Sequence, residues 1–288
     1  MKDIIIIGAG PSGVSAALYA KARGKDILIL EKEQIGGIIG HVSKVSHYAS
    51  VDKNETGESF RKKLEAQLKY SNIEVVYEKA ISIKKETDKF IIATDKDTYE
   101  AKKVIYAAGS KLKELEVDEI KSYHWPFGKE DLLKDKLVII NGGSDGAAKE
   151  GLYISKFARE VHIVQDKDKL LCIDEFKKKI EDSSNIIVHT SEKIVSKVSN
   201  SEIKLSSGKT IKDKDEILVF VQIGQSGNSD ILKNLENFDL ENSFVKTDIE
   251  STIDGLFFAG DIRVKSVRQV STAVCDGTIA GIKASQSL

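Results

Sequence analysis

Short apolar runs alternate with amphipathic and polar stretches along the chain, and the first run sets the pattern. Lys2 to Ile7 is predicted to form a buried strand, which leads into the turn Gly8-Ala9-Gly10-Pro11-Ser12-Gly13 and a helix over Val14 to Arg23. A second apolar strand over Asp26 to Leu30 ends at Glu31. Strand, glycine turn, helix, strand and acid in this order predict a βαβ unit that binds a nucleotide.

The residues of this turn have separate predicted roles. Gly8 permits the tight turn, Gly10 lets a pyrophosphate approach bare backbone, and Gly13 lets the helix pack closely on the strand. The helix N-terminus stabilises the negative charge of the phosphates. Glu31 follows Gly13 by eighteen residues, where a carboxylate can bind a pair of ribose hydroxyls. Gly36-Gly37 comes next, and it either brings backbone close to the ligand or only forms a loop.

A second unit with the same order of elements begins at Leu137. The strand Leu137 to Ile140 precedes a glycine turn over 141–148, a helix that runs to Phe157 and a strand over Val161 to Val164. The other predicted elements are a helix over Gly57 to Tyr70, a small antiparallel meander over Glu74 to Lys102, a strand over Val104 to Ala107, and strands near Ile186 to His189, Lys193 to Val198, Glu202 to Leu205 and Ile217 to Val221.

The first unit resumes after the second. The stretch from Lys111 to Lys121 loses its periodicity and becomes charged, as a linker does. From Phe244 the chain again predicts a strand, which ends at Gly260-Asp261, and the last helix is predicted over Arg268 to Ala284. We therefore expect an α/β fold with two Rossmann-like nucleotide-binding domains of the three-layer ββα type, the second inserted into the first. The expected domains are 1–113 with 244–288, and 114–243.

Composition narrows the class of protein. The 288 residues carry a net charge of -1 and are 41% hydrophobic, which is typical of a globular protein and argues against a nucleic-acid-binding surface. No apolar run approaches the ~20 residues of a membrane span. Ile4 to Ile7 is too short for a signal-peptide core, so we expect a cytoplasmic protein. Five scattered histidines and two cysteines, Cys172 and Cys275, predict neither a metal site nor a Cys-x-x-Cys pair.

Five motifs follow one another along the chain: GAGPSG, Glu31, Gly36-Gly37, the Ala-Ala-Gly that ends at Gly109, and FFAGDIRVKSVRQVSTA from Phe257. This series resembles the low-molecular-weight thioredoxin reductase-like family of FAD-dependent pyridine nucleotide oxidoreductases over essentially the whole chain. The resemblance implies bound FAD and a homodimer.

The resemblance also implies which residues hold FAD. Gly260-Asp261 would meet the ribityl chain, and Arg268-Gln269-Val270, at a helix start, would meet the flavin, where backbone N–H groups can stabilise negative charge on the ring. His47 stands where the family has an asparagine near the flavin. The implied FAD-binding residues are Gly8, Gly10, Pro11, Ser12, Gly13, Glu31, Gly36, Gly37, His47, Ala80, Ile81, Ala108, Gly109, Gly260, Asp261, Arg268, Gln269 and Val270.

The first departure from the family's pattern concerns its thiols. In the family, Ser-Tyr is followed by a Cys-x-x-Cys that passes electrons from flavin to thioredoxin, whereas here it is followed by His124-Trp125-Pro126-Phe127. Imidazole and phenyl groups cannot cycle through a disulfide, so we expect no dithiol relay at this place. His124 is the candidate catalytic residue, as a proton donor, with Trp125 over the flavin ring; alternatively both fill the gap left by the missing pair or pack in the domain linker. Cys275 is expected to be a small core residue of the last helix.

The second departure is in the glycine turn of the inserted domain. Ser144 replaces the glycine nearest the pyrophosphate, and its Cβ narrows the approach. Gln165-Asp166-Lys167 replaces the family's basic run. Asp166 would repel the 2′-phosphate of NADPH but could suit the ribose of NADH. We expect weak or absent binding of NAD(P)H.

Three functions remain open on the sequence. The first is an FAD-dependent oxidoreductase that exchanges electrons with a protein carrier such as ferredoxin or flavodoxin, or with a small acceptor, without a dithiol relay. The second is an NADH-dependent flavin reductase or oxidase. The third is a flavin-binding sensor or subunit that has lost turnover.

Overall fold

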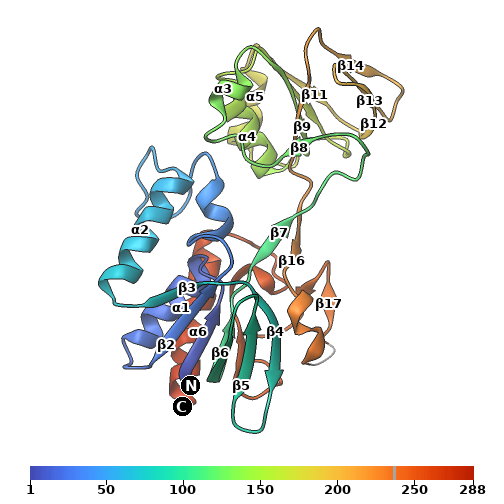
Figure 1. The fold of residues 1–288 in the computed structure, drawn as a ribbon. Helices are drawn as coiled ribbons and strands as arrows, with labels where there is room; N and C mark the ends of the chain where they lie inside the picture. Colours follow the sequence, from blue (N-terminus) through green and yellow to red (C-terminus); the bar gives the residue numbers. More distant parts are fainter. Residues whose placement is uncertain (236–237) are drawn as a thin grey trace. The chain divides into compact units, whose positions relative to one another are not determined.

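The computed structural model describes residues 1–235 and 238–288, and the chain divides into two compact units (Figure 1). Unit 1 consists of Met1–His41, Val45–Lys111 and Ser226–Leu288, and unit 2 of Val42–Lys44 and Leu112–Gln225. The described part of 226–243 thus joins unit 1, whereas the sequence placed it in the second domain. The reason is packing, because Leu232 is buried in the core of unit 1, with Ile231 and Leu235 against the same core.

Unit 1 is built on a seven-stranded sheet with the order β3-β2-β1-β6-β5-β4, in which β19 also pairs with β6. Parallel pairing joins β3, β2, β1, β6 and β19, and antiparallel pairing joins β4, β5 and β6. The expected meander is therefore only partly correct, because its first strand extends the parallel sheet. The strands are β1 (Lys2–Ile7), β2 (Ile27–Glu31), β3 (Glu74–Tyr77), β4 (Ala80–Lys85), β5 (Phe90–Thr94), β6 (Thr98–Tyr106) and β19 (Leu256–Phe258).

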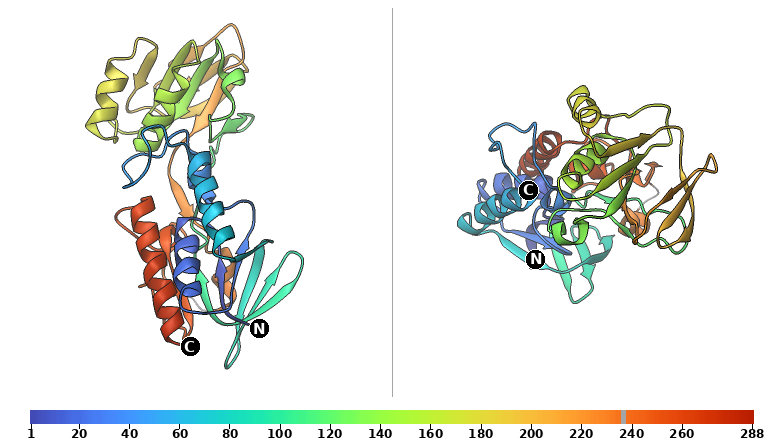
Figure 2. Two further views of the ribbon diagram at one scale, coloured as in Figure 1. Left: turned by 90° about the vertical axis from the view of Figure 1, so that its left-hand side faces the viewer. Right: turned by 90° about the horizontal axis from the view of Figure 1, so that it is seen from above.

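Two helices of unit 1, α1 (Pro11–Lys21) and α6 (Val270–Gln286), lie side by side (Figure 2). Glycines on α6 allow this close approach: a Cβ on Gly277 would lie 2.0 Å from the carbonyl oxygen of Ser12, and one on Gly281 would lie 2.4 Å from that of Ala16. The last helix is thereby fixed against the glycine turn. The other elements of unit 1 are α2 (Gly57–Tyr70), η1 (Gly37–His41), η2 (Asp230–Asn234), η3 (Gly260–Ile262), β17 (Leu240–Glu241) and β18 (Phe244–Val245).

Unit 2 has a five-stranded parallel sheet with the order β11-β10-β9-β15-β8. Helices α4 and α5 pack on one face, and the three-stranded sheet β12-β13-β14 packs on the other, which gives three layers. The helix α5 is absent from the sequence prediction. The elements are β8 (Ser122–Tyr123), α3 (Glu130–Leu133), β9 (Leu137–Asn141), α4 (Asp145–Ile154), β10 (Glu160–Val164), α5 (Asp174–Glu181), β11 (Ile186–His189), β12 (Ile194–Ser199), β13 (Glu202–Leu205), β14 (Thr210–Lys212) and β15 (Leu218–Val221).

The chain passes between the units through two short strands, β7 (Ser110–Leu112) and β16 (Gln225–Gly227), which pair with each other. The first of them begins at Ser110 and runs into the stretch from Lys111 to Lys121 that the sequence marks as a linker. Within the described ranges, no helix is long and apolar enough to cross a membrane.

Candidate functional site

The glycine turn after β1 is a stretch of tightly packed bare backbone. Gly8 has a left-handed φ of +103°, and a Cβ there would lie 2.4 Å from the carbonyl oxygen of Ala107. A Cβ on Gly13 would lie 1.9 Å from the carbonyl oxygen of Gly8, so the helix meets the strand without a side chain. Gly10 differs, because among the described residues the nearest atom to its Cβ position is the carbonyl oxygen of Gly36, at 4.0 Å. The space in front of Gly10 is open.

Gly36 and Gly37 lie against this opening. The N–H of Gly36 donates to the carbonyl oxygen of Ala9 at 2.8 Å, and a Cβ on Gly37 would lie 3.8 Å from the Cα of Gly10. Both glycines have a positive φ, of +95° and +55°. Bare backbone from two segments therefore meets where any side chain would fill the space that a diphosphate needs.

Glu31, at the end of β2, is oriented by the turn itself. Its carboxylate is buried and accepts the N–H of Ala9 at 2.7 Å on one oxygen and that of Glu33 at 2.9 Å on the other. Each oxygen keeps a lone pair for a second donor. The position, beside the glycine turn at the carboxyl edge of a parallel sheet, is the one that a ribose-binding acid needs.

The turn at Gly260-Asp261 is held by Asp276 on α6. One oxygen of this buried carboxylate accepts the N–H of Gly260 at 3.1 Å, and the side chains of Arg263 and Lys265 each donate to it at 3.0 Å. Asp276 is not among the residues that the sequence singles out, and no spacing rule predicts this network. The turn lies close to the start of α1, since a Cβ on Gly260 would lie 2.7 Å from the side chain of Ser12. The Asp276 network therefore holds the turn beside this helix.

Three buried side-chain atoms in this part of unit 1 lack a hydrogen-bond partner within the described structure: Ser12 Oγ, Asp261 Oδ1 and Arg268 Nε. Burial raises the pKa of the Asp261 carboxyl, which Lys265 and Arg268 partly oppose. Buried polar atoms normally have partners. The oxygens of Ser12 and Asp261 are therefore able to hydrogen-bond hydroxyl groups of a bound cofactor.

The N-terminus of α6 carries the last predicted residues. The helix begins at Val270 after Gln269, and its first turn contains no acidic residue, so the positive end of the helix dipole is left for another negative group. The guanidinium of Arg268 lies 3.8 Å from the ring centroid of Phe244 and donates to two backbone carbonyls of the preceding loop. Arg268 therefore also fixes the loop that leads into the helix.

The carbonyls that follow β6 are bound by a residue the sequence does not single out. Asn228 donates from its side chain to the carbonyl of Ala108 at 2.8 Å and from its backbone to that of Gly109 at 3.1 Å. The hydroxyl of Tyr106 donates in turn to the carbonyl of Asn228 at 2.5 Å. These bonds fix the end of β6 beside the glycine turn.

Three predicted residues lie in less constrained places. His47 is exposed in a loop with a left-handed φ of 60°. Ala80 and Ile81 begin β4, three residues after the end of β3, and the side chain of Ile81 is exposed. Their roles toward FAD stay predictions.

His124 directly follows β8 in unit 2. Its Nδ1 lies 3.0 Å from the carbonyl oxygen of Val221, and its Nε2 lies 3.1 Å from a carboxylate oxygen of Glu114. Both ring nitrogens of His124 therefore face acceptor oxygens. The side-chain amide of Gln222 donates to the His124 carbonyl at 2.7 Å. His124 thus joins the linker to the sheet, and its role as a proton donor stays a prediction that requires one of these contacts to open.

Phe127 and Trp125 also have local contacts. The Phe127 ring lies 6.1 Å from the ring of Tyr153 on α4, and the ammonium of Lys129 donates to the Trp125 carbonyl at 2.8 Å. This segment is therefore packed against the rest of unit 2.

Comparison with known proteins places the chain in a family. The family model for pyridine nucleotide-disulphide oxidoreductases matches residues 2–277. The chain belongs to this family. A thioredoxin reductase of Peptoclostridium acidaminophilum is 32% identical over 98% of this chain and 95% of its own, and one of Borreliella burgdorferi is 29% identical over 98% and 91%.

Solved structures share the fold. Thioredoxin reductase of Lactococcus lactis has a TM-score of 0.93 at 22% identity and covers 100% of this chain and 99% of its own. That of T. acidophilum has a TM-score of 0.91 at 25% identity and covers 99% and 98%. The predicted fold of two Rossmann-like nucleotide-binding domains is confirmed.

FAD is the cofactor of this family, and the protein is an oxidoreductase. Unit 1 fits the group, because it offers an open glycine cradle, a carboxylate oriented for ribose and buried polar atoms that lack partners. When bound, FAD supplies the electron-transfer chemistry. The glycine turn and Glu31 would then hold its phosphates and ribose, and the N-terminus of α6 would stabilise negative charge on the flavin.

The two cysteines lie in different units. Cys172 is buried in the core of unit 2, where burial raises the pKa of its thiol. The expectation for Cys275 is wrong, since this residue is exposed on α6. The buried face of that helix is formed by Ala273, Asp276, Gly277 and Ala280, and Cys275 points away from it.

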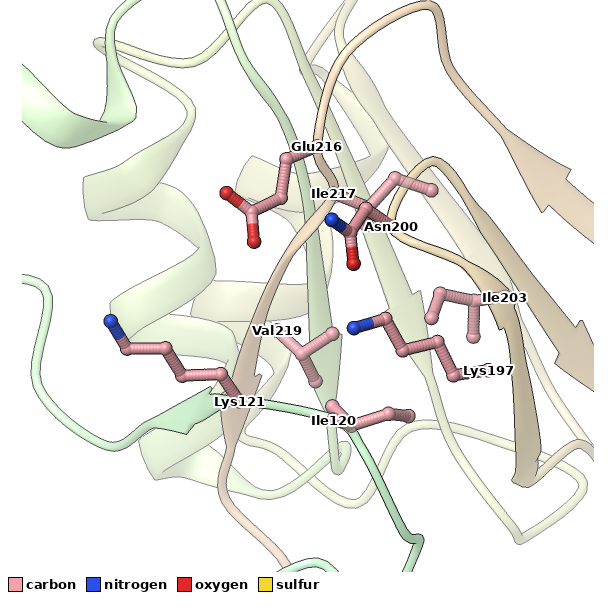
Figure 3. A pocket seen from close by; sticks show the side chains of 8 residues that line it. All are labelled: Ile120, Lys121, Lys197, Asn200, Ile203, Glu216, Ile217 and Val219. Atoms are coloured by element: carbon pink, nitrogen blue, oxygen red, sulfur yellow. The ribbon is translucent and has the colours of Figure 1, made fainter.

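A shallow hollow in unit 2 is lined in part by Lys121, Lys197 and Glu216 (Figure 3). It lies at the amino end of β15, whereas ligands of open α/β sheets bind at the carboxyl ends of the strands. The ammonium of Lys197 already donates to the carbonyl of Glu119 at 2.9 Å. We assign no ligand to this hollow.

Proposed function

We propose that the protein is an FAD-dependent oxidoreductase that exchanges electrons between its FAD and a protein carrier such as ferredoxin or flavodoxin, or a small acceptor, without a dithiol relay. The observation that carries this proposal is the contrast between the two units. Unit 1 offers a glycine cradle and a buried ribose-side carboxylate that fit FAD, while His124 and Phe127, which stand where the resemblance places the family's thiols, each have contacts of their own.

A thiol relay needs two sulfur atoms close enough to form and break a disulfide. The chain has only two cysteines. Cys172 is buried in unit 2, and Cys275 is exposed in unit 1. Electrons must then pass directly between the flavin and its partner. A Clostridium acetobutylicum protein named ferredoxin-flavin thioredoxin reductase shares the fold, with a TM-score of 0.56 at 24% identity over 99% of this chain. Its name supports ferredoxin as a donor to test. The same family resemblance supports a cytoplasmic homodimer.

Reduction of the bound flavin by different donors tests this function. Under anaerobic conditions, reduced ferredoxin or flavodoxin is expected to bleach the flavin absorbance at least about tenfold faster than NADH or NADPH at equal concentration. Rapid bleaching by NADH would instead support an NADH-dependent flavin reductase or oxidase. If none of the donors reduces the flavin, the protein is a flavin-binding sensor or subunit.

The absence of a thiol relay has its own test. A Cys172→Ser, Cys275→Ser double variant is expected to keep its rate of flavin reduction and reoxidation within about twofold of wild type, because neither sulfur lies on the electron path. The flavin absorbance of the purified variant shows whether FAD is still bound. Loss of turnover with FAD retained would show that one of these thiols takes part in the reaction.

A further inference from the structure

The glycine turns of the two units share one backbone pattern. The N–H of Gly8 donates to the carbonyl of Leu30 at 2.8 Å, and the N–H of Gly142 donates to the carbonyl of Val164 at 2.8 Å. Gly142 has a φ of +129°, and a Cβ there would lie 2.2 Å from the carbonyl oxygen of Gln222. In the same way, a Cβ on Gly8 would lie 2.4 Å from the carbonyl oxygen of Ala107. These bonds align the two turns residue by residue.

The alignment places Gln165, and not Asp166, at the position of Glu31. Glu31 directly follows Leu30, whose carbonyl binds the turn glycine of unit 1, and Gln165 directly follows Val164, whose carbonyl binds that of unit 2. Asp166 is exposed and pairs with Lys167 at 3.3 Å, so the sequence-based role of Asp166 in ribose binding is not supported by its place. Gln165 is buried, and its side chain covers the turn: a Cβ on Gly143 would lie 2.8 to 3.0 Å from three of its carbons. An amide stands where unit 1 has its ribose acid.

The segment that crosses back to the turn also differs. The N–H of Leu171 donates to the carbonyl of Gly143 at 2.8 Å, just as the N–H of Gly36 donates to the carbonyl of Ala9 at 2.8 Å. Leu171 and Cys172 therefore occupy the positions of Gly36 and Gly37. Unit 2 has side chains where unit 1 has bare backbone.

The helix that follows the turn begins with a negative charge. Ser144 stands at the position of Gly10, and α4 starts at Asp145, whose carboxylate accepts the N–H of Ile173 at 2.8 Å. The first turn of α1, in contrast, contains no acidic residue. A carboxylate at this end of α4 interacts favourably with the helix dipole and repels the phosphates that the same end would otherwise attract.

We propose that unit 2 retains the backbone of a dinucleotide-binding turn but that its own side chains, those of Ser144, Asp145 and Gln165, close the turn to NADH and NADPH. The family is named for pyridine nucleotides, and the residues present do not fit that group. The closure concerns binding within unit 2, so it is measured by nucleotide binding and not by reduction of the flavin.

Direct binding measurements on the FAD-loaded, oxidised protein test this closure. Isothermal titration calorimetry with NADH and with NADPH is expected to give dissociation constants weaker than about 1 mM for wild type. A Ser144→Gly, Asp145→Asn, Gln165→Glu variant, which removes the Cβ and the charge from the turn and places a carboxylate at the position of Glu31, is expected to bind NADH at least about tenfold more tightly than wild type and to gain less for NADPH. The asparagine can still accept the N–H of Ile173.

The matched control is Asp168→Asn, which removes one exposed carboxylate from the same loop without touching the turn. It should bind as weakly as wild type. Flavin absorbance, which depends on unit 1, reports that each variant is folded and loaded. Wild-type binding of either nucleotide below about 50 μM would overturn the closure. A triple variant that binds no better than Asp168→Asn would also overturn it, because these three side chains would then not be the cause.

Discussion

A Gly10→Asp variant is expected to purify as a colourless protein without FAD. The nearest described atom to a Cβ on Gly10 is the carbonyl oxygen of Gly36, at 4.0 Å, so the protein itself can accommodate a side chain. A carboxylate there, however, would face the diphosphate. Two unit charges about 4 Å apart repel by about 4 kcal/mol at an effective dielectric constant near 20, which lowers the affinity by roughly a thousandfold. Flavin absorbance per chain and the dissociation constant for added FAD measure the loss.

Gly10→Asn is the matched control, since asparagine has nearly the same shape and no charge. It should retain more FAD than the aspartate variant, and both should have the secondary structure of wild type by circular dichroism. Equal loss of FAD in the two variants would show that volume, and not charge, decides. Full FAD in Gly10→Asp would mean that the diphosphate does not lie at this turn.

The FAD-side turn could be predicted from the sequence because its constraints are local. Gly8 and Gly13 sit where a Cβ would meet backbone atoms at 2.4 Å or less, and such positions admit only glycine, so their spacing is itself the signal. Glu31 follows at the end of the next strand, a distance fixed by the length of one helix and one strand. The carboxylate that accepts the N–H of Ala9 is thus predictable without knowledge of the rest of the chain.

Other parts depend on contacts between distant segments. Asn228 binds the end of β6 across 120 residues of sequence, and no local pattern distinguishes it from any other asparagine. Cys275 lies within a small-residue run, but its exposure depends on which side of α6 meets α1. The sequence made Asp166 a candidate for the ribose of NADH because Gln165-Asp166-Lys167 stands where the family has a basic run. Only the hydrogen bond from Gly142 to Val164 shows that Gln165 has that position.

An Asp276→Ala variant is expected to lose about 3–5 kcal/mol of unfolding free energy, together with most of its FAD. The substitution leaves the partly buried side chains of Arg263 and Lys265 without their carboxylate and the N–H of Gly260 without its acceptor. Denaturant unfolding and flavin absorbance measure the two effects. Asp248→Ala is the matched control, because Asp248 is fully exposed and lies 3.9 Å from the same arginine, so its loss should change stability by less than about 1 kcal/mol. Should Asp276→Ala be as stable and as yellow as this control, the network would not hold the Gly260-Asp261 turn, and the turn would have to be fixed by its contact with Ser12 alone.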